Sequence, residues 1–142
     1  MNEFDCLKLE NQLCFPIYAC SKEIIKKYKP FLDEIDLTYT QYIVMMVLWE
    51  EREVNVKQLG KRLFLDSGTL TPLLKKLELK GYISRTRLKE DERNLQIELT
   101  KKGKVLQSKA QNIPQRIGKC IDLTPNEVKN LYKTLYKILG NI

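Results

Sequence analysis

The feature that most constrains the fold of this chain is the spacing of its apolar residues, which follows the helical period almost from end to end. One short stretch departs from it. Apolar and polar side chains alternate with period two over 95–99, and with 82–87 this stretch predicts a β-hairpin whose polar tip is 88–94. The 142 residues suffice for one domain with a hydrophobic core. We therefore expect a single, mainly α domain that carries a small β-hairpin.

Capping residues and prolines set the expected bounds of the helices. The first helix should run from about Asn11 to Lys29, because Pro30 disfavours the α conformation in the residue before it. Pro16 falls near its first turn, where a missing N–H costs little. Later helices are expected over 38–51, over 56–63 behind the cap Asn55, over 67–79 before the stop signal Gly81, from Thr100 to an interruption at Pro114, and from the capping box Thr124-Pro125-Asn126-Glu127.

Two of these helices, 56–63 and 67–79, are short and joined by a tight turn, which is the pattern of a helix-turn-helix. The hairpin follows at once, in the position of a wing. Narrow apolar stripes near both ends of the chain would stay wet in a monomer, so they predict a dimer. The expected fold is a winged helix-turn-helix with a DNA-binding unit over 38–100 and dimerisation helices over 8–30 and 101–142.

The absence of histidine excludes several kinds of site within one chain. No Ser/His/Asp or Cys/His pair, no zinc site with histidine and no imidazole pH switch can form. The four cysteines, at 6, 14, 20 and 120, include no C-x-x-C pair, which disfavours a metal site. We therefore expect a protein that is not an enzyme and that holds no metal and no cofactor.

Composition also indicates the compartment and the partner. No apolar run approaches the roughly 20 residues of a membrane span, and the N-terminus lacks the pattern of a secretory signal. We expect a cytoplasmic protein with reduced thiols and no membrane partner. The formal net charge of +7 favours binding to nucleic acid, with an affinity that falls as salt rises.

Four stretches of the sequence carry a family pattern: ENQLCF at 10–15, KYKPFLD with LTYTQY at 27–42, LDSGTLTPLLKKLE at 65–78, and DERNLQIELT at 91–100. The chain resembles the MarR family of winged-helix repressors, and within it the OhrR branch that senses organic hydroperoxides. The resemblance covers nearly the whole chain. It implies a homodimeric repressor on a pseudo-palindromic operator in double-stranded DNA, with an organic hydroperoxide as the inducer.

The resemblance also implies which residues contact DNA. They lie on the second helix of the helix-turn-helix and on the wing, where the family places an arginine in the minor groove. Short hydroxyls and free N–H groups at a helix start suit phosphates and base edges, and arginine suits a narrow minor groove. The residues are Asp66, Ser67, Thr69, Thr71, Pro72, Lys75, Asp91 and Arg93.

Cys14 matches the redox-sensing cysteine of this branch, and Tyr18, Tyr28 and Tyr39 match the tyrosines that stabilise its thiolate. Cys14 and Tyr28 are fourteen residues apart, so they share a helix face but lie about 21 Å apart along its axis. They can meet only across antiparallel first helices of two subunits. We therefore expect the sensing site at the dimer interface, where tyrosine hydroxyls and a helix N-terminus favour the thiolate.

Peroxide would convert this thiolate to a sulfenic acid, which then forms a disulfide or a cyclic sulfenamide. By the resemblance, Cys120 of the other subunit is a candidate resolving cysteine, and a small thiol in a mixed disulfide is the alternative.

Other functions stay open at this point. The cleft of a MarR-type regulator could hold a small apolar or aromatic ligand, with the thiol incidental. The role could also be that of a broader thiol-based regulator of virulence or oxidative stress. A thiol peroxidase or a purely structural dimer is a third class, which catalytic turnover with excess thiol would reveal.

Overall fold

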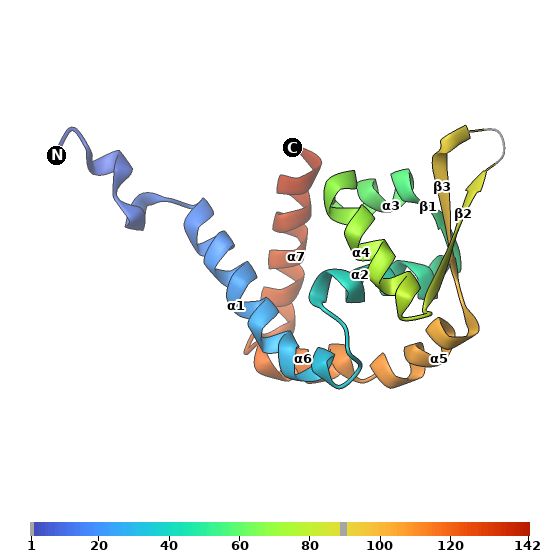
Figure 1. Cartoon of the computed structure of the whole chain (residues 1–142). Coiled ribbons are helices and arrows are strands. Elements are labelled where there is room, and N and C mark those ends of the chain that lie inside the picture. The colour runs from blue at the N-terminus through green and yellow to red at the C-terminus, as the bar shows by residue number, and fades with distance from the viewer. Residues whose placement is uncertain (1, 89–90) are drawn as a thin grey trace. The chain divides into compact units, whose positions relative to one another are not determined.

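The computed structural model describes residues 2–88 and 91–142, and for residues 88 and 91–94 it describes the backbone alone. The chain divides after Gln111 into two compact units. The first contains the 3₁₀ turns η1 (Asp5–Leu7) and η2 (Leu9–Asn11), α1 (Cys14–Asp33), α2 (Tyr39–Glu51), β1 (Glu53–Asn55), α3 (Val56–Leu63), α4 (Ser67–Leu79), β2 (Ile83–Leu88), β3 (Asp91–Leu99) and α5 (Lys101–Ala110) (Figure 1). The second contains α6 (Ile113–Cys120) and α7 (Pro125–Gly140).

The core of the first unit forms around α2. This helix begins with a capping box in which Thr38 accepts from the N–H of Gln41 and the Gln41 side chain accepts from the N–H of Thr38. Val44, Met45 and Leu48 are completely buried. The predicted helix over 38–51 is therefore confirmed, and six of its residues are buried. No helix among the described residues is long and apolar enough to cross a bilayer.

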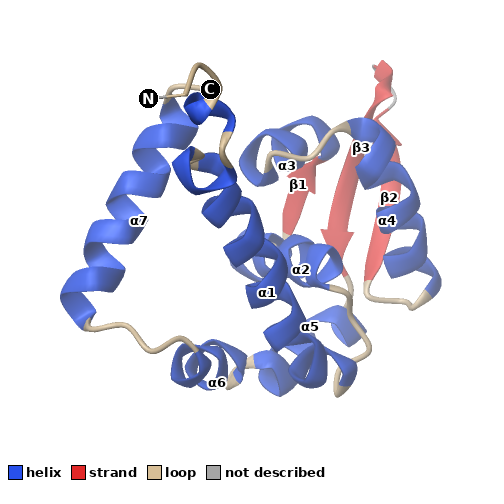
Figure 2. Ribbon diagram, turned by 90° about the vertical axis from the view of Figure 1, so that its left-hand side faces the viewer, coloured by secondary structure: helices blue, strands red, loops and turns tan. Residues whose placement is uncertain are grey.

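The hairpin is confirmed, but it belongs to a larger sheet than the sequence predicts. In the part of the chain that the structure describes, three antiparallel strands pair in the order β1-β3-β2, with β3 in the centre (Figure 2). The unpredicted strand β1 places Val54 opposite Ile97. Its three residues are too few to display a period, and their pairing partner lies more than forty positions later.

The first helix extends beyond its predicted end at Lys29. Pro30 lies inside α1, which continues to Asp33. Proline removes the hydrogen bond to the carbonyl four residues earlier and usually ends a helix. Here the last turn carries Leu32, which is only 2% exposed, so burial in the core outweighs the local cost.

The predicted start of the first helix at Asn11 is also wrong. Asn11 belongs to η2, and its side-chain amide donates to the carbonyl of Asp5 at 2.7 Å instead of capping a helix. The helix begins at Cys14, and no side-chain hydrogen bond caps it at Leu13. Pro16 stands third in α1, as predicted, where its missing N–H has no partner within the helix.

The expected single helix from Thr100 is two helices. Thr100 caps α5 as predicted, because its hydroxyl accepts from the N–H of Gly103 at 3.1 Å. The helix ends at Ala110, and Pro114 lies in the first turn of the separate helix α6. Proline is favoured in that position, so it starts a new helix and does not interrupt an old one.

The last helix begins as its sequence predicts. In the capping box of α7, Thr124 N–H donates to Glu127 at 2.8 Å and Glu127 N–H donates back to the Thr124 hydroxyl at 3.2 Å. None of the side chains of α7, all of which the structure describes, is buried.

Candidate nucleic-acid interface and thiol site

The turn between α3 and α4 is tight because of its backbone. Phe64 adopts the left-handed conformation with φ of 55°, and the N–H of Leu65 donates to the carbonyl of Gly60 at 3.0 Å. A Cβ atom on Gly60 would lie 2.8 Å from the carbonyl oxygen of Leu65, so only glycine allows this approach. With Leu59 and Leu70 buried beneath it, the turn fixes the angle between the two helices.

One face of α4 is polar and points to solvent. The buried side chains of the helix are Leu70, Leu73, Leu74 and Leu77. Six of the eight residues that the sequence predicts to contact DNA lie on or beside this helix and are exposed, namely Asp66, Ser67, Thr69, Thr71, Pro72 and Lys75. The structure therefore gathers these six residues on and beside the outer face of one helix.

Asp66 organises the start of that helix. Its carboxylate accepts from the N–H of Thr69 at 2.7 Å, which satisfies one of the free donors of the first turn. The hydroxyl of Thr71 donates to the carbonyl of Ser67 at 2.8 Å. Asp66 thus has a structural role as N-cap, beside any contact with a ligand.

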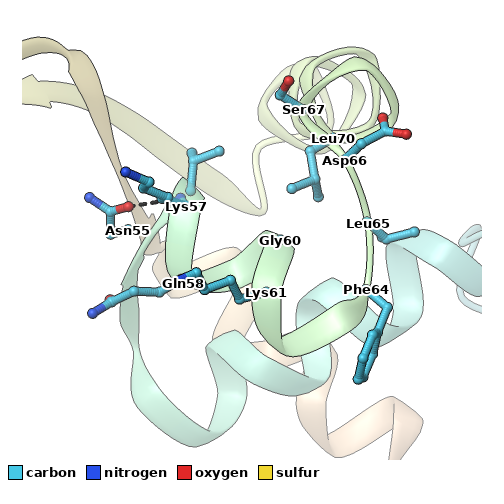
Figure 3. A pocket seen from close by; sticks show the side chains of 11 residues that line it. Asn55, Lys57, Gln58, Gly60, Lys61, Phe64, Leu65, Asp66, Ser67 and Leu70 are labelled. Carbon is cyan, nitrogen blue, oxygen red and sulfur yellow. Dashed lines mark hydrogen bonds between the residues drawn. The ribbon is translucent and has the colours of Figure 1, made fainter. Parts of the chain in front are cut away.

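A hollow lined by both polar and apolar side chains lies between α3 and the start of α4 (Figure 3). Lys57, Gln58 and Lys61 line it from α3, and Asp66 and Ser67 line it from the other side. Lys57 and Lys61 are four positions apart in α3, so both lie on the face of the helix that borders this hollow. Neither is among the residues that the sequence predicts to contact DNA.

The wing is joined to α4 by an ion pair. Arg85 of β2 donates to the Glu78 carboxylate at 3.1 Å, and this hydrogen bond lowers the pKa of Glu78. Asp91 and Arg93, predicted at the wing, belong to the backbone of β3, but their side chains lie outside the described residues. Their contacts with DNA stay a prediction.

The structure brings Tyr28 and Tyr39 together. Their ring centroids are 5.0 Å apart, and Tyr42 completes a cluster at 5.9 Å from Tyr28 and 6.4 Å from Tyr39. Burial, and then the neighbouring phenols, raise the pKa of Tyr28 to about 12. Burial raises the pKa of Tyr39 as well. Both hydroxyls therefore keep their protons at neutral pH and can donate hydrogen bonds.

Tyr42 was missed from the sequence. It is 3% exposed, and its ring also meets Trp49 edge-on at 6.3 Å. A helix that is apolar on most sides does not reveal which of its aromatic residues faces which neighbour. The only signal is the i, i+3 spacing of Tyr39 and Tyr42, which places both rings on the side of α2 that faces α1.

Cys14 is the first residue of α1 and is exposed. Tyr18 follows one turn later and is also exposed, with the Lys22 ammonium 5.2 Å from the centre of its ring. Tyr28 lies in the same helix, about 21 Å from Cys14 along the helix axis. One chain therefore unites Tyr28 with Tyr39 but leaves Cys14 and Tyr18 apart from them.

The three other cysteines lie apart from Cys14 in the sequence. Cys6, Cys20 and Cys120 are free and exposed, and Cys120 is the last residue of α6. Among the side chains that the structure describes, no three of Cys, Asp or Glu gather as a ligand set.

Apolar side chains are uncovered along the helices near both termini. Leu13, Phe15 and Ile17 of the first helical segment are between 39% and 74% exposed. In α7 the predicted stripe is between 36% and 51% exposed and consists of Val128, Leu131, Leu135 and Ile138. Surfaces of this kind mark contacts with another molecule.

Comparison with known proteins identifies the family. The family model described as transcriptional regulator SarA/Rot matches residues 26–113. The chain is 48% identical to the organic hydroperoxide resistance transcriptional regulator of Bacillus subtilis over 141 residues, which are 99% of this chain and 96% of that protein. It is 56% identical to the HTH-type transcriptional regulator SarZ of Staphylococcus saprophyticus, covering 93% of this chain and 90% of that protein.

Solved structures agree with the fold. The structure of reduced AbfR bound to DNA matches with a TM-score of 0.77 and 36% identity, covering 95% of this chain and 94% of that chain. The Staphylococcus aureus MepR–DNA complex, at 23% identity, matches with a TM-score of 0.80, which supports the winged-helix fold alone. The sequence resemblance is thereby confirmed: the chain belongs to the MarR family of winged-helix transcriptional regulators, in the branch that contains the organic hydroperoxide resistance regulator and SarZ.

Proposed function

We propose that this chain is a homodimeric DNA-binding repressor whose Cys14 thiolate senses organic hydroperoxides, and that oxidation releases the operator. The proposal rests on the pairing of Tyr28 with Tyr39, whose ring centroids are 5.0 Å apart. Both hydroxyls keep their protons and can donate hydrogen bonds to an acceptor. The names of the relatives support the choice of oxidant. The protein acts in the cytoplasm, where its operator lies, as a regulator and not as an enzyme.

The acceptor comes from the second subunit. When the α1 helices of two chains run antiparallel, the start of one meets the end of the other, and Cys14 faces Tyr28 and Tyr39 of the partner subunit. Two phenol donors and the positive end of a helix stabilise a thiolate. The exposed Leu13, Phe15 and Ile17 give this site apolar walls, which suit an alkyl peroxide better than hydrogen peroxide.

The domain arrangement follows from the same exposures. Residues 8–30 and 101–142 pair the subunits, because they carry the uncovered apolar side chains of α1 and α7. Residues 38–100 read DNA. Two copies of α4, related by a twofold axis, then enter major grooves about 34 Å apart on a pseudo-palindromic operator, and Asp91 and Arg93 of each wing lie along the adjacent minor groove.

The chemical step is a displacement at oxygen. The thiolate attacks the terminal oxygen of the hydroperoxide, the O–O bond breaks, and the products are a cysteine sulfenic acid and, after protonation, an alcohol. A thiol then displaces water from the sulfenic acid to give a disulfide, the thiol being Cys120 of the partner subunit or a small cellular thiol. Either product removes the acceptor from Tyr28 and Tyr39, and the α1–α2 region relaxes.

Fluorescence anisotropy tests the proposal. A duplex covering the region upstream of the protein's own gene is titrated at fixed salt, before and after one equivalent of cumene hydroperoxide per chain, and again after dithiothreitol. We expect binding to be lost and then restored. Cys14→Ser should bind DNA and ignore peroxide, whereas Cys20→Ser, a matched exposed cysteine of the same helix, should respond like the native chain.

Other outcomes would point elsewhere. If Cys14→Ser still releases DNA on oxidation, the thiol is incidental and a small apolar or aromatic ligand becomes the favoured effector. If excess thiol sustains continuous peroxide consumption, the protein is a peroxidase. Intact mass of the oxidised dimer distinguishes a disulfide to Cys120 from a mixed disulfide and from a sulfenamide.

A further inference from the structure

One side chain ties the end of α4 to the corner between α1 and α2. The ammonium of Lys80, the residue that follows α4, donates to the main-chain carbonyl of Asp36 and lies 3.4 Å from the side-chain oxygen of Gln41. The Asp36 carboxylate is 3.5 Å away. The carbonyl of Lys80 accepts in turn from the ammonium of Lys102 at 2.8 Å. These partners are 39 and 44 positions away from Lys80 on one side and 22 on the other, so the contact joins separate elements.

Gln41 connects this contact with the tyrosine cluster. It is a polar residue buried in the core, 4% exposed, and its side-chain oxygen also accepts from the N–H of Thr38 at 3.0 Å. The same turn of α2 carries Tyr39, and the next residue after Gln41 is Tyr42. A single helical turn therefore holds both the rings that pack on Tyr28 and the oxygen that faces Lys80.

We propose that Lys80 is a positioning residue that passes a rearrangement of the tyrosine cluster to the recognition helix. The inference rests on the proposed function and names how the sensing site controls the DNA-binding face. Loss of the thiolate acceptor frees Tyr28 and Tyr39, the α1–α2 corner shifts, and the end of α4 follows because the Lys80 ammonium is bonded to that corner. Coupling of this kind is carried by hydrogen bonds between rigid elements.

The length of α4 carries the shift to its other end. α4 has 13 residues and is therefore about 20 Å long. Because a continuous helix moves as a rigid element, a displacement at the end that holds Lys80 would tilt the opposite end, which carries the exposed residues Ser67 and Thr69. The DNA-contacting end thus responds to a contact that itself lies outside the predicted DNA interface.

A competing role for Lys80 is simple attraction of its charge to DNA. Lys76 provides the matched control, because it lies one turn earlier on α4 and carries the same charge. Lys76 and Lys80 both line a second hollow, which lies beside the α1–α2 corner. Among the described side chains, none forms an ion pair with Lys76. If charge alone matters, removal of either lysine should lower the affinity for DNA to a similar extent, but only removal of Lys80 breaks the link to Gln41 and Asp36.

The experiment compares the full-length dimers of the native chain, Lys80→Met, Lys76→Met and Lys80→Arg. For each, the dissociation constant for the upstream duplex is measured at fixed salt in the reduced and the oxidised form. The quantity of interest is the ratio of the oxidised to the reduced constant. We expect Lys80→Met to reduce this ratio at least about fivefold, the lower end of typical coupling between sites. Lys76→Met should keep the native ratio, and Lys80→Arg should restore it.

Two results would overturn the inference alone: a native chain that releases DNA on oxidation together with an unchanged ratio in Lys80→Met, or an equal loss of ratio in Lys76→Met. A native chain that keeps its DNA after oxidation would overturn the proposed function and this inference with it, since no switch would be left to couple. Lys80→Gln, with a neutral polar side chain, repeats the comparison should the methionine variant not fold.

Discussion

Replacement of Gly103 by alanine should destabilise the protein, although alanine is the better helix former. Gly103 lies in the first turn of α5, where a Cβ atom would stand 2.2 Å from the carbonyl oxygen of Tyr82 and 2.7 Å from a methyl carbon of Leu99. Such distances are far inside ordinary van der Waals contact, so the helix or the start of β2 must move. That movement affects the junction between the wing and α5.

The magnitude follows from the groups that would have to shift. Overpacking of a filled site costs about 1–3 kcal/mol. The carbonyl of Tyr82 also accepts from the N–H of Thr100 at 3.1 Å, and the Trp49 indole donates to the carbonyl of Gly103 at 2.9 Å. Each such hydrogen bond contributes about 1 kcal/mol. Against a cost of roughly 3–5 kcal/mol stands a helical gain of about 1 kcal/mol, so the free energy of unfolding should fall by about 2–4 kcal/mol.

Urea unfolding at fixed protein concentration, followed by the fluorescence of Trp49, measures the change. Gly118→Ala is the matched control, because Gly118 lies in the helix α6 and a Cβ atom there meets nothing within 4 Å in the described chain. That variant should be more stable than the native protein by about 0.5–1 kcal/mol. A Gly103→Ala protein as stable as the native one would refute the steric reasoning.

Three further substitutions test the site. In Asp66→Ala the helix α4 loses its cap, so the free energy of unfolding measured in urea should fall by about 1 kcal/mol and DNA binding should weaken. Asp66→Asn should keep both the cap and the stability. Equal stability of the two variants would contradict the capping role. The pKa of the Tyr28 phenol is about 12 in the folded chain and about 10 in the unfolded chain. Between these pH values unfolding releases a proton, so the free energy of unfolding should fall as the pH rises. Tyr28→Phe should show a shallower fall in alkaline urea titrations, and identical slopes would exclude the shifted group. Lys75→Gln should weaken binding to every duplex, and the slope of log K against log salt should become shallower by roughly 0.9 for each phosphate that the lysine neutralises. An unchanged slope would show that Lys75 does not contact the phosphate backbone of the DNA.

Local signals predicted most of the fold, because caps and glycine stops depend on neighbours in the sequence. Asn55 accepts from the N–H of Lys57 at 2.7 Å as expected, and Gly81 ends α4 with φ of 82°. The errors fall where distant contacts decide. The burial of Leu32 carries α1 past Pro30, and β1 exists only because β3 pairs with it.

The candidate site was predictable to the same degree. The polar face of α4 follows from helical spacing, and the pairing of Tyr28 with Tyr39 came from the resemblance to the family. The third ring, Tyr42, and the contact of Lys80 with Gln41 could not be anticipated, because both depend on how α1, α2 and α4 meet in space. The period of the sequence shows which face of a helix is apolar, but it does not show which residue of another helix packs against that face.

Because the side chains of α7 are uncovered, the response should depend on the number of protein copies per cell. A helix with no buried residue gains free energy from packing only when a second surface covers it. Below the dissociation constant of the dimer, the concentration of paired chains rises with the square of the total. Halving synthesis would then quarter the form that spans two half-sites, so growth and dilution alone would lift repression at low expression. Oxidation would then act only on the dimers present, and the concentration of the chain in the cell sets how many there are.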